Sequence, residues 1–303
     1  MPYLGIEIGG TKLQMLVAET PFHILERRET RVEAAQGAEG IRAWIARELS
    51  SLLETHQVSA VGVGFGGPVD RKRGCVARSH QIEGWAGFPL QEWLHQLAKV
   101  PVVIENDANT AALGEAWHGA GRHRDPVFYI TLGSGVGGGL VTGGRIYHGK
   151  PPGEAEVGHV RLDREGTTLE SRCSGWAVDQ RIRAAVARGS EGSLARRVRE
   201  DPGQEARHLA AALADGDPLA AALVREIVED LAFGLSHVVH LFHPEVIILG
   251  GGLSGLGEPL RAGIASALPR HLMEVFRPGP EIALSALGRD AVPVGAIELA
   301  RWA

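Results

Sequence analysis

One local pattern, a strand followed by a glycine-rich turn and a second strand, occurs twice along the chain. The first copy is centred on Gly9-Gly10-Thr11-Lys12 and the second on residues 133–139. Glycine-rich turns of this kind bring backbone N–H groups close to an anion, and Thr11 and Lys12 add a hydroxyl and a cation. Two similar halves that each begin with such a hairpin predict a duplicated protein that holds a polyphosphate between them.

The glycines also produce the spacing G-x-G-x-x-G twice, once from Gly62 to Gly67 and once from Gly133 to Gly138. A dinucleotide-binding fingerprint requires a helix immediately after the glycines. Pro68 and a loop follow the first copy, and another strand pattern follows the second. The sequence therefore argues against a Rossmann site at either place.

A polar motif, Glu105-Asn106-Asp107-Ala108-Asn109, lies between an apolar run and the start of a helical segment. The apolar run is typical of a short buried strand, so it delivers Asn106 and Asp107 to its carboxyl end, where open α/β sheets bind ligands. A carboxylate placed there can accept a proton from a substrate hydroxyl. Asp and Asn are also favoured at helix N-caps, and the motif alone leaves that alternative open.

Composition restricts the classes of partner. The chain has 303 residues and a net charge of -5, which is enough length for two domains and leaves no basic footprint for nucleic acid. No signal peptide precedes the first strand and no apolar run approaches membrane-spanning length. We therefore expect a cytoplasmic protein with neither nucleic-acid nor membrane partners. Cys75 and Cys173 fit no metal-ligand spacing. One disulfide between them is an alternative, but we interpret them as two buried thiols in a reducing compartment.

Together these motifs resemble the ROK family of sugar kinases (repressor, open reading frame, kinase), glucokinase-like members of the actin-like ATPase superfamily. The resemblance covers nearly the whole chain and rests on several ordered stretches: residues 7–12, 66–70, 105–109, 132–159 and 249–252. Any one stretch would be unspecific, whereas their combined order is specific. The resemblance implies an α/β fold of two actin-like (ribonuclease H-like) lobes with an ATP cleft between them.

The resemblance also sets the expected domain boundaries. Residues 1–121 should form the N-terminal small lobe and residues 122–291 the C-terminal large lobe. The closing helix, residues 292–303, is expected to return to the first lobe. The family resemblance suggests a homodimer, although nothing in the sequence itself sets the oligomeric state.

Carried over residue by residue, the resemblance assigns Asp107 as the general base and as a substrate ligand. The other substrate-binding candidates are Gly67, Gln81, Asn106, Glu156, His159 and Glu170. The candidates for ATP binding are Gly9, Gly10, Thr11, Lys12, Gly133, Ser134, Gly135, Gly250, Gly251 and Gly252. Glu7 stands where the family usually has Asp, and it is expected to contact Mg²⁺ or its water shell. Without the motif context, Glu156 and His159 would fit a solvated loop.

The chain departs from the family pattern between His159 and Glu170, where the family has a cysteine-rich zinc loop. This stretch contains no cysteine here. Structural zinc uses three or four ligands of the Cys/His type, so we predict no structural zinc and expect His159 to serve the sugar alone. Gln81 replaces an asparagine that often contacts the sugar, a change that bears on specificity.

The implied function is ATP-dependent phosphorylation of a hexose with Mg²⁺ as the metal cofactor, and glucose phosphorylated at its 6-hydroxyl is the first hypothesis. Kinases for N-acetylmannosamine, N-acetylglucosamine, fructose or mannose are alternatives that composition does not separate. A transcription regulator is disfavoured because no room for a helix-turn-helix precedes Tyr3. A non-catalytic sugar-binding sensor is kept open by Glu7 and the altered zinc loop, but the retained Asp107 argues against it.

Overall fold

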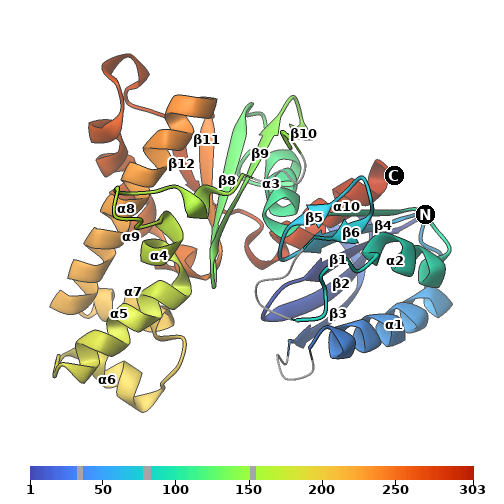
Figure 1. Cartoon of the computed structure of the whole chain (residues 1–303), viewed down its shortest axis with the longest axis horizontal. Helices are drawn as coiled ribbons and strands as arrows, with labels where there is room; N and C mark the ends of the chain where they lie inside the picture. The colour runs from blue at the N-terminus through green and yellow to red at the C-terminus, as the bar shows by residue number, and fades with distance from the viewer. Residues whose placement is uncertain (33–36, 78–82, 151–154) are drawn as a thin grey trace. The chain divides into compact units, whose positions relative to one another are not determined.

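The computed structural model describes residues 1–32, 37–77, 83–150 and 155–303. The chain forms two compact units, each assembled from more than one segment. The first unit contains residues 1–123, 139–155 and 286–303, and the second contains residues 124–138 and 156–285. The chain therefore passes between the units after His123, Gly138, Ala155 and Ser285. Figure 1 is coloured by residue number, so each of these segments can be located along the chain.

The first unit is built on a five-stranded sheet with the order β3-β2-β1-β4-β7. Its strands are β1 (Tyr3–Ile8), β2 (Lys12–Thr20), β3 (His23–Arg31), β4 (Val61–Phe65) and β7 (Val102–Asn106). Its helices are α1 (Gly37–Thr55), α2 (Leu90–Ala98), α3 (Asp107–His118) and α10 (Ala291–Arg301), and the short strands β5 (Val69–Asp70) and β6 (Cys75–Val76) pair separately. Because β1, β4 and β7 run parallel, their carboxyl ends lie at one edge of the sheet.

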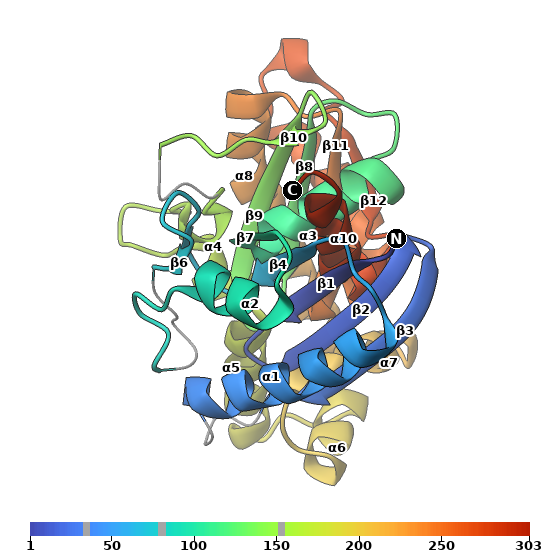
Figure 2. The same cartoon turned by 90° about the vertical axis from the view of Figure 1, so that its right-hand side faces the viewer.

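Side chains along each strand alternate between the two faces of this sheet. Leu4, Ile6 and Ile8 belong to one buried cluster with residues of α1 and α2. Gly5 points to the other face, where a Cβ would lie 2.6 Å from the carbonyl oxygen of Pro293 in α10. Figure 2 shows α1 and α10 on opposite faces of the sheet. Glycine at position 5 thus lets α10 approach the strand closely.

The glycines of β4 also allow α10 to pack closely on the sheet. A Cβ on Gly62 would lie 1.8 Å from the carbonyl oxygen of Ala296, and one on Gly64 would lie 2.5 Å from a methyl carbon of Val292. Val63, between them, points into the core of the opposite face. The first G-x-G spacing therefore reflects close packing of α10 on the sheet and not dinucleotide binding.

The second unit carries β8 (Val127–Leu132), β11 (Val246–Gly250) and β12 (Glu281–Leu284), with β11 parallel to both neighbours. They belong to a sheet of order β10-β9-β8-β11-β12, whose remaining strands are β9 (Val136–Thr142) and β10 (Arg145–Ile146). Its helices are α4 (Leu169–Cys173), α5 (Gly175–Ala187), α6 (Ser193–Glu200), α7 (Leu209–Ala214), α8 (Pro218–Phe242) and α9 (Glu258–Ala267). The predicted α/β fold class is confirmed by this alternation of strands and helices.

Residues 139–155, expected in the second lobe, group with the first unit instead. The cause lies in β9, which packs against α3 from Gly139 onward. A Cβ on Gly139 would lie 2.7 Å from the Cβ of Ala112 and 2.8 Å from the carbonyl oxygen of Ala108. The unit boundary therefore falls inside a strand, where no change of composition marks it.

Within the described part of the chain, no helix combines the length and the apolar character that crossing a bilayer requires.

Candidate functional site

Three strand ends meet at one edge of the first unit's sheet. The last residues of β1, β4 and β7 pair across the sheet in one row, and the residues that follow them are Gly9, Gly66 and Asp107. The Gly66 N–H donates to the carbonyl of Ile8 at 2.8 Å. A Cβ on Gly66 would lie 3.3 Å from the Cα of Gly9 and 3.4 Å from Oδ2 of Asp107. The predicted base therefore lies beside the first glycine loop.

The start of α3 assigns different roles to the two polar residues of the central motif. Asn106 is the N-cap, and its side-chain oxygen accepts hydrogen bonds from the N–H groups of Ala108 at 2.9 Å and Asn109 at 3.1 Å. Its amide nitrogen donates to the Gly67 carbonyl at 3.3 Å. Asp107 is the first helical residue and is half-buried. The capping role thus falls to Asn106, and the carboxylate of Asp107 is presented at a helix N-terminus, which favours a negative charge.

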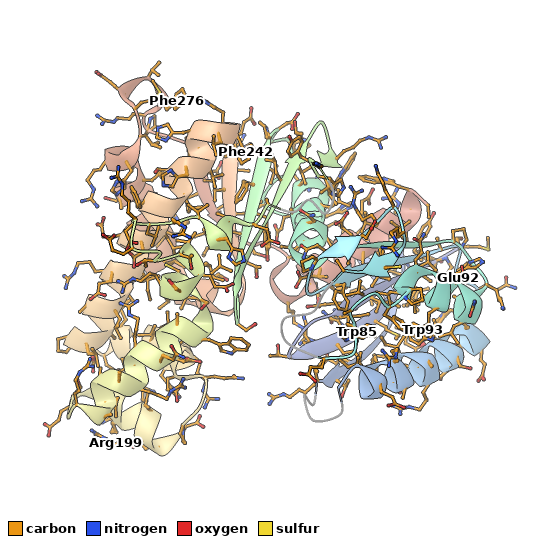
Figure 3. The ribbon with its side chains drawn as sticks, in the orientation of Figure 1. Trp85, Glu92, Trp93, Arg199, Phe242 and Phe276 are labelled. Atoms are coloured by element: carbon orange, nitrogen blue, oxygen red, sulfur yellow. The ribbon has the colours of Figure 1, made fainter. Side chains whose placement is uncertain are left out.

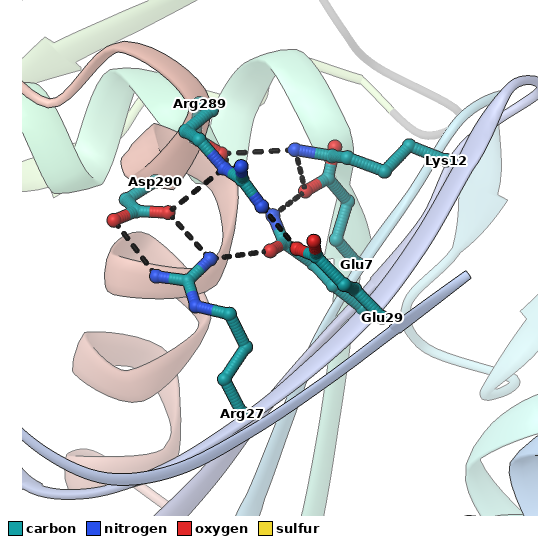
Figure 4. A network of polar contacts seen from close by, with 7 residues as sticks. Glu7, Lys12, Arg27, Glu29, Arg289 and Asp290 are labelled. Carbon is teal, nitrogen blue, oxygen red and sulfur yellow. Dashed lines mark hydrogen bonds and ion pairs between the residues drawn. The ribbon is translucent and has the colours of Figure 1, made fainter. Parts of the chain in front are cut away.

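The first glycine loop is a tight turn in which the Gly9 N–H donates to the Lys12 carbonyl at 2.9 Å. Glu7 precedes it, and its Oε2 accepts a hydrogen bond from Gln14 at 2.5 Å and pairs with the Lys12 ammonium at 2.9 Å (Figure 4). Burial raises the pKa of Glu7, while Lys12 and Gln14 oppose that shift. A single acidic group fits a magnesium ion that is bound mainly by phosphate oxygens and water.

A network of charges ties this loop to the start of α10, as Figure 4 shows. The buried Gln14 donates to the Arg289 carbonyl at 3.1 Å and accepts from Arg27 at 2.8 Å. Arg27 in turn pairs with both carboxylate oxygens of Asp290, at 2.8 and 2.9 Å. Asp290 immediately precedes α10, and Lys12 itself donates to the Arg289 carbonyl at 3.0 Å, so the turn before the closing helix is joined to the first glycine loop. One sign of this network was visible in the sequence, because Gln14 is a polar residue inside the apolar part of strand β2.

The second unit carries the other glycine loop, residues 133–135, at the end of β8. The carbonyl of its first residue accepts a hydrogen bond from Gly175 at 2.7 Å. Oε2 of Glu170 accepts from the Val136 N–H at 2.8 Å and would lie 2.6 Å from a Cβ on Gly135. Glu170, predicted as a sugar ligand, therefore holds the glycine loop in place.

The third glycine run, residues 250–252, follows β11 beside this loop. A Cβ on Gly250 would lie 2.0 Å from the Tyr129 hydroxyl, and one on Gly251, which has a φ of +80°, would lie 2.5 Å from the backbone of Leu132. Open space surrounds the Cβ position of Gly252. Glycine at position 250 thus leaves room for the Tyr129 hydroxyl, glycine at 251 leaves room for the backbone at the end of β8, and Gly252 borders open space.

Two further sugar-ligand candidates, Glu156 and His159, are exposed; Glu156 precedes the short 3₁₀ turn Val157–His159, and His159 is its last residue. A Cβ on Gly158 would lie 2.2 Å from the carbonyl oxygen of Val136, so this turn packs against the start of β9, directly after the second glycine loop. Glu156, His159 and Glu170 all belong to the second unit, whereas Asn106 and Asp107 belong to the first.

Residues 160–169, which stand where the family has its zinc loop, form hydrogen bonds among themselves. The Leu162 N–H donates to the Thr167 carbonyl at 2.8 Å. Oδ1 of Asp163 accepts from the N–H groups of Gly166 at 2.9 Å and Thr167 at 3.0 Å, and hydrogen bonds from Thr167 lower the pKa of Asp163. Among the described residues, no group of three or more side chains is arranged to hold a metal ion.

Both cysteines are free thiols. Cys173 is fully buried, and its burial raises the pKa of the thiol. Cys75 is only half-buried, so the interpretation of both as buried thiols is wrong for Cys75, which lies on the short strand β6 away from the main sheet.

Gln81 lies outside the described residues. Trp85, which follows it closely in the sequence, is 1% exposed and packs edge-to-face on Phe65 at 5.2 Å and on Phe88 at 5.4 Å between ring centroids. Figure 3 labels Trp85 and Trp93, which packs on the far side of Phe88. Trp85 is therefore part of the core behind β4.

Glu105 is a site residue that the sequence left without a role. Its side chain is 2% exposed, and Oε1 accepts from the Asn106 N–H at 2.8 Å. Oε2 lies 3.5 Å from Nε of Arg71 and 3.4 Å from Nε2 of His148. Burial raises the pKa of Glu105, and the hydrogen bond from Asn106 opposes that shift. The available signal was a charged residue at the end of an apolar strand.

Comparison with known proteins agrees with this geometry. The sequence profile of the ROK family matches residues 3–302. Glucokinases of Thermotoga maritima and Streptomyces coelicolor are 32% and 34% identical to the chain, and each alignment covers 98% of it and 96% and 97% of the relative. The crystal structure of a ROK family glucokinase from Streptomyces griseus in complex with glucose and AMPPNP is 33% identical, with complete coverage of both chains and a TM-score of 0.88.

The profile match extends over nearly the entire sequence, and the relatives cover it at more than 30% identity. The structural likeness extends over the same length, so the predicted pair of actin-like lobes is confirmed. The chain belongs to the ROK family, in a form without the zinc-binding cysteines.

Proposed function

We propose that the protein is an ATP-dependent glucokinase that transfers the γ-phosphoryl group of ATP to the 6-hydroxyl of glucose. The observation that carries this proposal is the position of Asp107, whose carboxylate lies beside Gly66 and the first glycine loop. The glucokinase relatives support glucose as the acceptor, and the glucose and AMPPNP complex of the Streptomyces griseus enzyme supports ATP as the donor.

In the proposed reaction, Asp107 accepts the proton of the sugar 6-hydroxyl while that oxygen attacks the γ-phosphorus. The bond between the γ-phosphorus and the β–γ bridging oxygen breaks, and ADP leaves with the bond's electrons. Phosphoryl transfer depends mainly on positioning and on neutralising charge. A base held at the end of β7 and oriented by the Asn106 cap satisfies the first requirement.

Backbone N–H groups of residues 9–12 and 133–135 are proposed to bind the phosphates, and residues 250–252 to bind the adenosine. Lys12 adds a positive charge beside Glu7. Mg²⁺, when bound, neutralises charge on the phosphate oxygens, and Glu7 is the carboxylate that would hold it directly or through water.

Asn106, Glu156, His159 and Glu170 are proposed to bind the sugar hydroxyls, together with Gly67 and Gln81. A site built from such groups rejects a sugar that lacks the matching hydroxyl, because its own polar groups would be left unpaired. Glu170 also holds Val136 in the second glycine loop, so one side chain is proposed to serve both the sugar and the loop.

A coupled ADP-release assay tests the function directly. The panel contains glucose, mannose, fructose, N-acetylglucosamine and N-acetylmannosamine with Mg-ATP. We expect the highest kcat/KM for glucose, and we expect Asp107→Asn to lower kcat by about 10²–10⁴-fold. The melting temperature of the variant should stay close to that of the wild type, because Asn is tolerated in the first turn of a helix.

Turnover on an acetylated sugar alone would overturn glucose as the substrate while keeping the mechanism. Nucleotide binding without turnover on any sugar would overturn the kinase assignment and favour a sugar-binding sensor. Full activity of Asp107→Asn would remove Asp107 as the base.

We further propose that the protein acts as a homodimer in the cytoplasm, where its nucleotide donor is made. Light scattering of the purified protein measures the mass of the assembly, and a mass near 32.2 kDa, that of one chain, would contradict the dimer.

A further inference from the structure

Two of the chain's passages between the units are held at one point of the first unit. The chain leaves the first unit after His123 and enters it for the last time at Ala286. The backbone just before His123 and the backbone that begins at Ala286 both lie at the C-terminal end of α3. Both segments are hydrogen-bonded there to one side chain, that of Glu115.

The carboxylate of Glu115 divides its two oxygens between these segments. Oε2 accepts from the Ala120 N–H at 2.8 Å and from the Ala286 N–H at 3.3 Å. Oε1 accepts from the Leu287 N–H at 2.9 Å. Glu115 is 0% exposed, and all four residues belong to the first unit.

The backbone around this carboxylate is shaped to contain it. The N–H groups of Gly119 and Gly121 both donate to the backbone carbonyl of Glu115 at 3.0 Å. A Cβ on Gly119 would lie 1.9 Å from Oε2 of Glu115, so only glycine leaves room for the buried oxygen. Burying a carboxylate is unfavourable unless hydrogen bonds compensate it, and three backbone donors do so here.

The same helix carries Asp107 at its other end. Glu115 follows Asp107 by eight residues in α3, a rise of about 12 Å at about 1.5 Å per residue. A short, buried helix moves as a rigid rod, so a displacement at its C-terminal end reaches its N-terminal end. Any movement of the second unit must be absorbed by the backbone at the passages.

We propose that Glu115 is a positioning residue of the phosphoryl transfer: it fixes two passages between the units to α3, and so couples movement of the second unit to the helix that presents Asp107. The proposal rests on the kinase activity proposed above. Glu115 acts through the backbone of Ala120, Ala286 and Leu287 and through α3.

Glu115→Gln tests the proposal, because an amide offers one oxygen where two are needed and turns an NH₂ group toward a backbone donor. We expect kcat for glucose to fall about tenfold, the size of effect typical when a hydrogen bond to a charged group is lost. The KM for glucose should stay within about twofold. ADP release without sugar should rise as a fraction of total ADP release, because a loosened coupling no longer restricts transfer to water.

Glu298→Gln is the matched control. Glu298 is also buried, at 3% exposure, and lies on α10 against α3, where it binds His118 at 2.9 Å and Arg301 at 2.8 Å. His118 is the last residue of α3, so this variant disturbs the same end of the helix while leaving the hydrogen bonds to the passages intact. Its replacement should lower the melting temperature about as much as Glu115→Gln does, with kcat and the fraction of sugar-independent ADP release unchanged.

Hydrogen exchange gives a readout that does not depend on activity. The amides of Ala120, Ala286 and Leu287 should be protected in the wild type and in Glu298→Gln, and exposed to exchange in Glu115→Gln. Glu115→Asp, which keeps the charge but is one methylene shorter, should release one passage and keep the other protected. This variant serves as the test if Glu115→Gln does not fold.

The outcomes separate the two proposals. If the wild-type protein shows no sugar-dependent turnover, the kinase assignment is overturned and the positioning role falls with it. Loss of amide protection in Glu115→Gln would then confirm only that Glu115 holds the two passages by hydrogen bonds. Unchanged kcat and coupling in both Glu115 variants overturn the positioning role. The same losses in Glu298→Gln would also overturn it, because they would then follow from general destabilisation.

Discussion

At the scale of single residues, the charges buried between α3 and α10 make stability depend on pH. Burial alone would raise the pKa of Glu298, but the hydrogen bond from His118 and the charge of Arg301 outweigh it and lower the pKa overall. A carboxyl whose pKa is lowered by folding adds stability above its unfolded pKa of about 4.5, and this stability is lost as the pH falls through the folded pKa.

We therefore expect Glu298→Gln to lower the free energy of unfolding at pH 7 and to have a smaller effect at pH 4, which lies below the unfolded pKa, so that part of this stability is already lost there. Urea unfolding at both pH values measures the two differences. An equal or larger difference at pH 4 would show that the His118 and Arg301 contacts do not stabilise the charged form.

The sequence located the polar residues at the end of β7 because an apolar run followed by Asn and Asp has one natural interpretation in an α/β protein. It did not separate the cap from the base, since both residue types suit both roles. The contact between Glu170 and Val136 was also out of reach. It depends on how α4 packs on the loop after β8, which no local pattern records.

At the scale of secondary structure, α10 reaches the sheet through glycines and not through large side chains. Gly62→Ala would place a Cβ 1.8 Å from the Ala296 carbonyl, and backbone cannot move aside as a side chain can. We expect this change to lower the free energy of unfolding by at least about 2 kcal/mol, within the range of overpacked cores.

Gly255→Ala is the control for that change. Gly255 is exposed, and no atom lies within 4 Å of its Cβ position, so the expected effect stays within about 0.5 kcal/mol. Chemical denaturation of both variants measures the comparison. Equal stability of the two variants would contradict the close approach of α10.

The long helices could be predicted from the spacing of their apolar residues. Apolar residues recur at helical spacing over several turns in both α1 and α8, so the sequence alone predicts these two helices. The two-residue strands β5 and β6 are too short to show any period. The reason for the glycines of β4 was missed as well, because it lies in a helix more than two hundred residues later.

At the scale of the whole molecule, the proposal assigns sugar ligands to each unit, Asn106 and Asp107 to the first and Glu156 and His159 to the second. A ligand that binds both stabilises only the state in which both are folded. We expect scanning calorimetry to show two unfolding transitions without ligand and one transition at a higher temperature with glucose and AMPPNP.

Two ligand-free transitions that both keep their midpoints when the ligands are added would contradict the proposed set of sugar ligands. The duplicated hairpin predicted two halves from the sequence. The boundary inside β9 was not predictable, because it is decided by the packing of Gly139 on α3 and not by a linker.

The division of the first unit into three segments also determines when it can fold during synthesis. The ribosome produces β1 to α3 first, then the second unit with residues 139–155 of the first unit between its two segments, and α10 only afterwards. Until then α3 covers Gly64 on one face of the first sheet, but the part of that face around Gly5 and Gly62, which receives α10, has no cover. The second unit, mostly one continuous stretch, can be complete while the first still waits for its last helix. A nascent chain of this protein therefore leaves part of this sheet uncovered until its last residues are made.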